Sequence, residues 1–357
     1  MKAIVVHPGQ ADSIHMHDMP DPQMRPTQVA VRMLRVGLCA TDAEINEGVF
    51  GTAPEGEELL ILGHENLGVV EDVGKKVKGF KAGDVVVSTV RRPCGVCPQC
   101  RAGENDMCSS GQYTERGIKG RHGFMAEYYV EVPQFLHKIH KAVSGFAVLL
   151  EPMSIVEKGI DNIFGIQRRV TWRPDLAMVL GAGPIGLLAA AVLRVRGFRT
   201  IVIGRESPAD LRAQIAQQLG AEYISVANRS LLELPKDTGF PDIVVEATGS
   251  AQVVFDAMQI LGANAVLCLL SVTGGDSIKP EPIDRINTHI VLGNQVVLGS
   301  VNANARHFAM GAKDFVAIDR KWPGALNRML NDRRPWKDYK EWFEHRGDAI
   351  KTTLEIG

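Results

Sequence analysis

Apolar residues come in short runs over the first half of the chain, and each run is bounded by glycine, proline or charged positions. Four of these runs have the length and the β-branched or aromatic content of strands. A helical stretch at 154–160 follows Glu151 and Pro152, and proline is tolerated in the first turn of a helix. The pattern predicts a mainly β domain over residues 1–172. Its expected strands include 3–6, 29–36, 85–87 and 124–130.

Beyond Pro174 the pattern changes to apolar stretches that alternate between strand and helix character. Repeated βα units with buried strands predict a parallel, doubly wound sheet, so the expected fold class is α/β. This second domain is expected to span 173–302, and the tail 303–357 to return to the first domain. The expected strands are 176–180, 200–203, 223–226, 242–249, 264–270 and 295–299; the expected helices are 187–196, 208–219 and 251–261, with tail helices at 305–315 and 324–330 and a last strand at 351–356.

The composition suits a globular protein of two ordinary domains, since 45% of the 357 residues are hydrophobic. The 40 basic and 41 acidic residues are well mixed, which argues against nucleic acid or an anionic membrane as a partner. The uncharged run 176–193 has membrane length, but a cluster of glycines and Pro184 interrupts it, so we interpret it as strand, turn and helix. The amino terminus lacks the apolar run of a secretory signal. A cytoplasmic protein that acts on a small molecule is expected.

Four of the six cysteines lie within fifteen residues, in a loop rich in glycine and proline. In a reducing compartment such crowding indicates metal rather than disulfides, and four thiolates on one short loop can close a tetrahedral zinc shell. A [4Fe-4S] cluster is the competing interpretation. A closed shell leaves no position for substrate, so this metal is expected to stabilise the loop. The four cysteines are Cys94, Cys97, Cys100 and Cys108.

A second metal site is suggested by His64 and Glu65, which stand side by side in an apolar segment between Gly63 and Gly68. Cys39 ends an apolar run upstream and could be a plain core thiol next to a helix cap. Together, Cys39, His64 and a carboxylate supply three zinc ligands. A catalytic zinc needs such an incomplete shell, with one position left for water or substrate oxygen.

A nucleotide site is suggested by the glycine pattern that begins at Gly181, because it stands between a strand and a helix. Glycines there let backbone N–H groups approach a pyrophosphate at the helix N-terminus. The next strand ends at Gly204 and Arg205, where an NAD site usually has an acidic residue. This favours NADP, with Arg205 facing the 2′-phosphate, while Glu206 remains an alternative ribose ligand for NAD.

With these motifs in order, the chain resembles the zinc-dependent medium-chain dehydrogenases/reductases over nearly its full length. Within that family it is most similar to the glucose 1-dehydrogenases of archaeal type. The resemblance implies a mainly β, GroES-like catalytic domain joined to a Rossmann domain, one catalytic and one structural zinc, and pairing of subunits into a dimer or tetramer. The segments that carry the closer similarity are 89–93, 115–118, 150–158 and 299–302, leading to His307 and Phe308.

The resemblance also assigns roles to individual residues. Cys39 and His64 bind the catalytic zinc, with Glu65 and Glu151 as direct or water-bridged ligands. The implied sugar-facing residues are Thr41, Thr89, Glu115, Glu151 and Asn302. The implied nucleotide-lining residues are Gly181, Gly183, Pro184, Ile185, Gly186, Gly204, Arg205, Glu206, Ser271, Ser300, Val301 and Asn302.

The expected activity is zinc-assisted oxidation of an aldose at C1 to the lactone, with hydride transfer to NADP or NAD. Thr41 is the expected first step of proton exit. The first alternative is a polyol or secondary-alcohol dehydrogenase of the same family, against which the segment around Glu115 argues. The second is a non-catalytic NADPH-binding protein that keeps zinc only in the cysteine loop.

Overall fold

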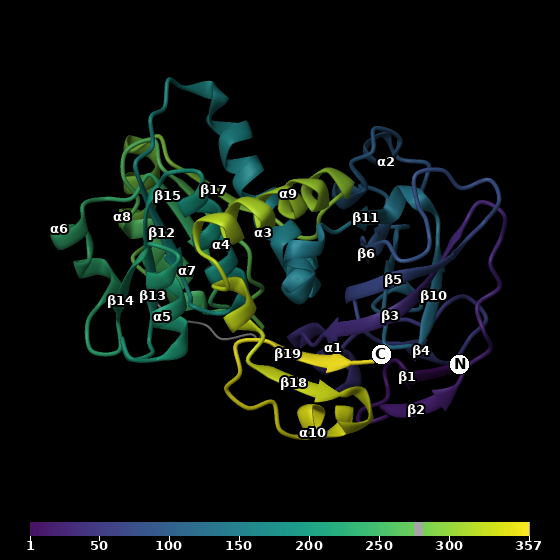
Figure 1. The fold of residues 1–357 in the computed structure, drawn as a ribbon. Helices are drawn as coiled ribbons and strands as arrows, with labels where there is room; N and C mark the ends of the chain where they lie inside the picture. Colours follow the sequence, from purple (N-terminus) through teal and green to yellow (C-terminus); the bar gives the residue numbers. More distant parts are fainter. Residues whose placement is uncertain (275–280, 357) are drawn as a thin grey trace. The chain divides into compact units, whose positions relative to one another are not determined.

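The computed structural model describes residues 1–274 and 281–356 and divides the chain into two compact units (Figure 1). Unit 1 comprises Met1–Ser154, Asn302–Val316 and Leu330–Gly357, and unit 2 comprises Ile155–Val301 and Ala317–Met329. Each unit has its own cluster of buried hydrophobic side chains. No helix within the described ranges is both long and apolar enough to cross a membrane.

The main sheet of unit 1 is built around β3 (Val29–Gly37). Val29, Val31 and Met33 are buried at alternate positions, because successive side chains of a strand point to opposite faces. β3 pairs with β5 in an antiparallel register that shifts twice, at 30/31 and at 33/35. Counted over the described residues, the sheet has seven strands, in the order β11 (Leu136–Lys138), β6 (Val85–Ser88), β5 (Glu65–Val73), β3, β19 (Thr352–Glu355) and β18 (Asp332–Pro335), with β10 (Tyr128–Glu131) also paired to β3.

Smaller sheets and short helices complete unit 1. One sheet has the order β2 (His15–Asp18), β1 (Lys2–Val6) and β4 (Leu60–Ile61), and another has β7 (Arg91–Arg92), β8 (Thr114–Arg116) and β9 (Gly120–Arg121). The helices that lie within it are α1 (Ala40–Asn46), α2 (Pro98–Arg101) and α10 (Tyr339–Glu344), with 3-10 turns η1 (Asn105–Met107), η2 (Pro133–Phe135), η3 (Lys141–Leu149) and η7 (Trp336–Asp338).

Close backbone contacts fix the segment between β4 and β5. A Cβ on Gly117 or Gly123 would lie 2.4 or 2.3 Å from the Gly63 carbonyl oxygen, so glycine is required at both positions. The Phe124 N–H donates to Gly63 O at 2.9 Å. The expected strand 124–130 is therefore regular only from Tyr128, because the backbone before it bonds to this crossing chain.

Unit 2 is a parallel sheet. Over the described residues it has six strands, in the order β14 (Glu222–Ser225), β13 (Arg199–Gly204), β12 (Leu176–Leu180), β15 (Ile243–Glu246), β16 (Val266–Leu269) and β17 (Val296–Gly299). Numbered within the unit this is 3-2-1-4-5-6, the doubly wound order that places a nucleotide where the strand order reverses, beside β12. The predicted parallel sheet is thus confirmed, and Cys268 is buried in β16.

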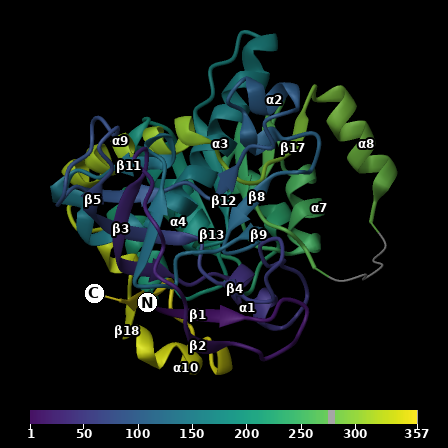
Figure 2. The ribbon, with the colours of Figure 1, turned by 90° about the vertical axis from the view of Figure 1, so that its right-hand side faces the viewer.

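The helices of unit 2 follow its strands. They are α4 (Pro184–Val195), α5 (Leu211–Gln218), α6 (Pro235–Thr238), α7 (Ala251–Gln259) and α8 (Ile283–Leu292), with 3-10 turns η4 (Gln167–Arg169), η5 (Leu231–Glu233) and η6 (Leu326–Met329). Figure 2 shows α7 and α8 side by side. α8 is absent from the sequence-based prediction. The tail stretch 324–330 forms the short 3-10 turn η6 instead of an α-helix.

Two long helices belong partly to each unit, which explains a difference from the expected boundaries. α3 (Leu150–Ile166) passes from unit 1 into unit 2 at Ile155, and α9 (Ala305–Lys321) does so at Ala317. A Cβ on Gly159 would lie 2.9 Å from Leu270 Cδ2, so this part of α3 packs tightly within unit 2. The predicted division at 172/173 follows a change in composition, whereas the compact units divide inside these helices.

Candidate active site

Three of the predicted metal ligands meet within unit 1. Cys39 is the N-cap of α1, just after β3 ends, and His64 directly precedes Glu65, the first residue of β5. Gly37 and Glu65 are partners across the sheet, which brings the two segments together. One ligand atom each from Cys39, His64 and Glu65 lies within 4.8 Å of the others.

One buried atom of this cluster, Glu65 Oε2, has no hydrogen-bond partner among the described residues. His64 is only 5% exposed and Glu65 only 1%. Unpaired polar atoms at such depth are costly, so a cation beside the Cys39 thiol is the partner that this donor set fits. A Cβ on Gly37 would lie 2.1 Å from Glu65 Oε2, so only glycine leaves room for the carboxylate.

The other oxygen of Glu65 is held by Lys351, a residue that the sequence does not single out. Lys351 Nζ donates to Glu65 Oε1, and both side chains are almost completely buried. Burial lowers the pKa of Lys351, but the negative charge of Glu65, followed by that of Cys39, outweighs it and raises the pKa. The ammonium group therefore stays charged beside the cluster.

Asp42 joins the two segments of the cluster and is likewise not among the predicted site residues. Its Oδ2 accepts from the Cys39 N–H at 3.0 Å and its Oδ1 from the Gly63 N–H at 3.2 Å. Oδ1 also lies 3.4 Å from His64 Nδ1. Burial lowers the pKa of His64, but the charge and hydrogen bonding of Asp42, together with those of Cys39, outweigh burial and raise the pKa well above the ordinary value. Asp42 thus positions a thiol and an imidazole from outside the ligand set.

Glu151 lies in the first turn of α3 and does not belong to the group of ligand atoms within 4.8 Å. Burial raises the pKa of Glu151 to about 7; the nearby charge of His64 opposes that rise and the charge of Glu65 reinforces it. The carboxyl group is therefore close enough for the charges of the cluster to shift its pKa. Its pKa suits the exchange of a proton near neutral pH.

The predicted sugar-facing residues are spread over several elements of unit 1. Glu115 in β8 and Asn302 meet, because Asn302 Nδ2 donates to Glu115 Oε1 at 2.5 Å. Thr89 is buried, and its Oγ1 accepts from Arg92 Nη1 at 3.0 Å. Thr41 lies in α1, two residues after Cys39.

The four predicted cysteines of the loop converge around α2 and η1. One Sγ from each lies within 4.8 Å of the others, and Cys97 Sγ is 3.8 Å from Cys108 Sγ. The backbone N–H of Cys97 donates to Cys94 Sγ, and that of Cys100 donates to Cys97 Sγ, each at 3.4 Å. Hydrogen bonding to Ser110 and to the amides of Cys97 and Val96 lowers the pKa of Cys94 to about 5. The donor set fits a tetrahedral zinc ion.

The predicted nucleotide turn joins β12 to α4 in unit 2. Gly181 has φ +104°, and a Cβ there would lie 2.7 Å from Ala247 O. A Cβ on Gly186 would lie 1.9 Å from Gly181 O, so the turn closes only with glycine at both positions. Gly183 is the N-cap of α4, and Pro184 and Ile185 form its first turn. The first N–H groups of this helix are the usual site for a pyrophosphate.

The end of β13 carries the residues that bear on the choice of cofactor. Glu206 Oε2 accepts from its neighbour's amide, Arg205 N, at 3.0 Å and from Tyr223 Oη at 3.2 Å. The Arg205 guanidinium has no hydrogen-bond partner among the described residues. A hollow of about 500 Å³ lies here, with two arginines, two serines and no acidic side chain in its lining; its residues are Arg205, Ser207, Pro208, Ser225, Ala227, Asn228 and Arg229.

The remaining predicted nucleotide residues lie after β16 and β17. Ser271 Oγ donates to Glu246 Oε2 at 2.5 Å and accepts from Gly249 N at 2.9 Å. Ser300 Oγ is buried without a partner among the described residues, and Val301 is 63% exposed. Asn302, the last of the set, is assigned to unit 1.

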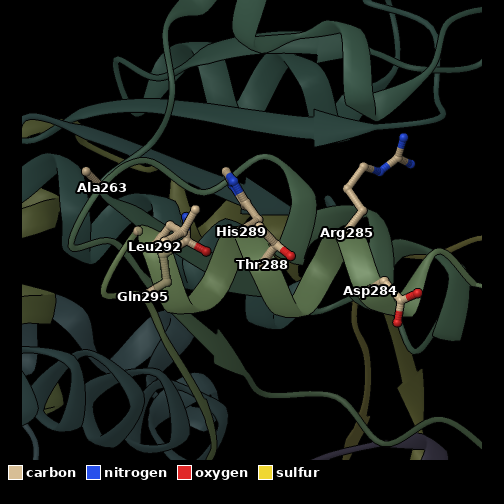
Figure 3. A pocket seen from close by; sticks show the side chains of 8 residues that line it. Ala263, Asp284, Arg285, Thr288, His289, Leu292 and Gln295 are labelled. Carbon is tan, nitrogen blue, oxygen red and sulfur yellow. The ribbon is translucent and has the colours of Figure 1, made fainter.

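A further hollow of unit 2, about 600 Å³, lies beside α8 (Figure 3). Arg285 and His289 project from the same side of the helix. Arg285 donates to Gln259 Oε1 at 2.7 Å, and His289 Nε2 lies 3.0 Å from Leu261 O. The residues that line it are none of those predicted for the active site.

Comparison with known proteins settles the family. Residues 144–356 match the family described as "Glucose dehydrogenase C-terminus", and residues 25–141 match "Alcohol dehydrogenase GroES-like domain". The chain belongs to the zinc-dependent medium-chain dehydrogenases, in their glucose dehydrogenase branch. Its mainly β unit is thus the GroES-like domain, and the parallel sheet is the Rossmann domain.

Full-length relatives agree with this placement. The glucose 1-dehydrogenase of Methanocella arvoryzae is 44% identical over 100% of both chains. Glucose 1-dehydrogenase 1 of Caldivirga maquilingensis is 41% identical over 100% of this chain and 99% of the relative. A solved structure of the Haloferax mediterranei glucose dehydrogenase "in complex with NADP, Zn and gluconolactone" superimposes with a TM-score of 0.89 and 32% identity, covering 100% of this chain and 99% of the other.

Proposed function

We propose that this chain oxidises an aldose, D-glucose or D-galactose, at C1 to the lactone and reduces NADP. The observation that carries the proposal is the cluster of Cys39, His64 and Glu65, which presents an incomplete cation shell within a chain of the glucose dehydrogenase family. When bound, zinc supplies a Lewis acid for the C1 hydroxyl and NADP supplies the hydride acceptor.

The residues of the chain that would hold zinc are Cys39 and His64, with Glu65 and Glu151 as the two carboxylates near them. Glu65 is restrained by Lys351 on one oxygen, which leaves Oε2 for the cation. Glu151 is close enough for the charges of His64 and Glu65 to act on it, and a carboxylate so placed can accept a proton from the substrate hydroxyl and release it again. Thr41, two residues from Cys39, is the proposed start of the exit route for that proton.

Orientation of the sugar is proposed for Thr89, Glu115 and Asn302, besides Thr41 and Glu151. Glu115 Oε1 is already bonded, whereas no donor among the described residues reaches its Oε2. A carboxylate oxygen of this kind can accept hydrogen bonds from sugar hydroxyls and fix the ring. A simple alcohol such as 2-propanol has no further hydroxyl to offer this oxygen and would leave it unpaired, which favours a polyhydroxylated substrate such as an aldose.

The nucleotide is proposed to lie along Gly181, Gly183, Pro184, Ile185 and Gly186, with the adenosine ribose at the end of β13. Arg205 has no hydrogen-bond partner among the described residues and the hollow beside it has no acidic side chain in its lining, which suits a 2′-phosphate. Glu206 is bonded to Tyr223 and to the backbone, so it is less available to the ribose of NAD. The further residues of this proposed set are Gly204, Ser271, Ser300, Val301 and Asn302.

A cytoplasmic location and a homo-oligomeric state, dimer or tetramer, are part of the proposal. Four cysteines grouped as a metal site, in place of disulfides, are typical of a reducing compartment. Val291 and Leu292, at the end of α8, are 63% and 78% exposed, and neighbouring large apolar side chains on the surface commonly mark a protein interface. Light scattering of the purified protein measures the assembly.

The proposed function is tested by initial rates of cofactor reduction with glucose, galactose, xylose, sorbitol and 2-propanol, each with NAD and NADP. We expect kcat/KM for an aldose with NADP to exceed that for sorbitol by about 100-fold or more. Equal rates with aldoses and polyols would favour the polyol dehydrogenase alternative. A zinc content of one ion per chain in place of two, with the same content in Cys39→Ala, would favour a non-catalytic NADPH-binding protein.

A further inference from the structure

Arg91 links the proposed sugar carboxylate to the cysteine loop. It stands in β7 directly opposite Glu115 in β8, and its Nε donates to Glu115 Oε1 at 3.0 Å. The same guanidinium donates through Nη1 to the Asp106 carbonyl oxygen at 2.9 Å. It also lies 3.7 Å above the Tyr113 ring. One buried side chain therefore bonds to the substrate-facing residue and to the loop at once.

The loop holds Arg91 through a second bond. Asn105 Nδ2 donates to the Arg91 carbonyl oxygen at 3.0 Å. Asn105 and Asp106 form η1, the turn that ends at Cys108, the last cysteine of the metal set. Both residues are buried, at 9% and 4% exposure, so this contact is a fixed part of the interior.

Asp106 extends the contact to the second sugar-facing residue. Its Oδ1 accepts from Asn304 Nδ2 at 2.8 Å, in a buried bond. Asn304 follows Asn302 by two positions, and Asn302 has a left-handed φ of +60°. Asn302 Nδ2 in turn donates to Glu115 Oε1. The turn before Cys108 thus supports both residues that are proposed to orient the sugar.

We propose that the metal of the four-cysteine loop sets the affinity for the sugar, because it fixes the turn that positions Arg91, Glu115 and Asn302. The inference rests on the proposed sugar site. Without its anchor at Cys108, the 105–107 turn is free to move, and Arg91 loses the acceptor and the donor that restrain it. Glu115 then loses a fixed direction for Oε2, and small displacements of an orienting group weaken binding strongly.

Cys108→Ser is the first test, with zinc content, KM for glucose, KM for NADP and kcat measured on the folded full-length enzyme. We expect one zinc fewer per chain, a KM for glucose raised about tenfold, and an unchanged KM for NADP, since a charge-assisted hydrogen bond is worth about that factor. Gln99→Ala is the matched control, because Gln99 lies in the same loop. Among the described residues its side chain bonds only to the Ser109 hydroxyl, which donates to Gln99 Oε1. It should leave the KM for glucose unchanged.

Asn105→Ala is the second variant, and it keeps all four cysteines. We expect it to raise the KM for glucose in the wild-type background, to add no further rise in a Glu115→Gln background, and to lower hydrogen-exchange protection of 114–116. The inference is overturned if neither Cys108→Ser nor Asn105→Ala changes the KM for glucose. It is also overturned if Asn105→Ala raises this KM equally in the wild-type and Glu115→Gln backgrounds. Either result leaves the oxidation of glucose itself in place. A wild-type enzyme that does not oxidise glucose overturns the proposed function and this inference together.

Discussion

Lys351 Nζ donates to one oxygen of Glu65 in the interior of unit 1, while the other oxygen of the same carboxylate has no partner among the described residues. The two residues are separated by 286 positions, and the sheet pairing of β19 with β3 brings them together. Glu65 is therefore held in one orientation before any cation binds. One oxygen of this carboxylate lies within 4.8 Å of a ligand atom of His64 and of Cys39.

Removal of Lys351 is expected to destabilise the protein. Lys351→Met leaves a buried Glu65 without its countercharge, which costs about 3 kcal/mol or more in the free energy of unfolding. Lys2→Met is the control, because Lys2 makes a similarly short ion pair with Asp18 at 2.7 Å but on the exposed surface. Its effect should stay below about 1 kcal/mol. Urea unfolding of both variants measures the difference, and equal losses contradict the role given to burial.

Cofactor preference is expected to depend on Arg205. Arg205→Gln should raise the KM for NADP at least about tenfold and leave the KM for NAD nearly unchanged, since only the 2′-phosphate loses a charged hydrogen bond. Arg199→Gln is a matched control at the other end of β13, where the side chain pairs with Glu222 at 2.9 Å. Steady-state kinetics with both cofactors test this. A parallel rise of both KM values would place Arg205 outside the 2′-phosphate site.

Acid sensitivity is expected from Glu131, which accepts from Arg92 Nη2 at 2.5 Å and from Arg116 Nη2 at 2.8 Å. Burial raises the pKa of Glu131, but Arg116 and Arg92 outweigh it and lower the pKa from 4.5 to about 2. A lowered folded-state pKa means that the carboxylate stabilises the fold above pH 4.5, and that this contribution disappears as the pH falls towards 2.

The test compares wild type with Glu131→Gln. At pH 7 the variant should be less stable by about 3 kcal/mol, and the gap should narrow as the pH is lowered below the ordinary carboxyl pKa. Glu71→Gln serves as the control, because Glu71 pairs with Arg32 on the exposed surface at 3.2 Å. Chemical unfolding from neutral to acid pH measures both curves. A difference in unfolding free energy that widens at acid pH contradicts a lowered pKa for Glu131.

Local motifs were enough to predict much of this molecule. The turn at Gly181 and the loop from Cys94 to Cys108 are defined by neighbours in the sequence, so their spacing alone indicates a nucleotide turn and a metal site. Cys39 and His64 required the additional assumption that two distant segments meet. The pairing of Gly37 with Glu65 shows why they do.

Residues that act through long-range contacts could not be found this way. In the sequence, Asp42 has the position of a residue that caps a helix. Only the fold shows that its carboxylate accepts from the Gly63 N–H and lies close to His64 Nδ1. Lys351 and Arg91 look like ordinary surface charges until their partners are known. α8 has no side-chain cap at its N-terminus, where Pro282 is the N-cap, and Ile286 is the one residue of the described helix that is buried. A short helix that buries so little has a weak apolar pattern in the sequence.

The central claim is that hydride leaves C1 of an aldose for a nicotinamide, with Cys39 and His64 holding the zinc that assists. Glucose deuterated at C1 tests it directly, with the reduced cofactor and the sugar product analysed by mass spectrometry. The account predicts that NADPH carries the deuterium, that the product is the unlabelled lactone, and that Cys39→Ala abolishes the transfer. Deuterium retained in the product, or transfer that persists in Cys39→Ala with its zinc content unchanged, would contradict it.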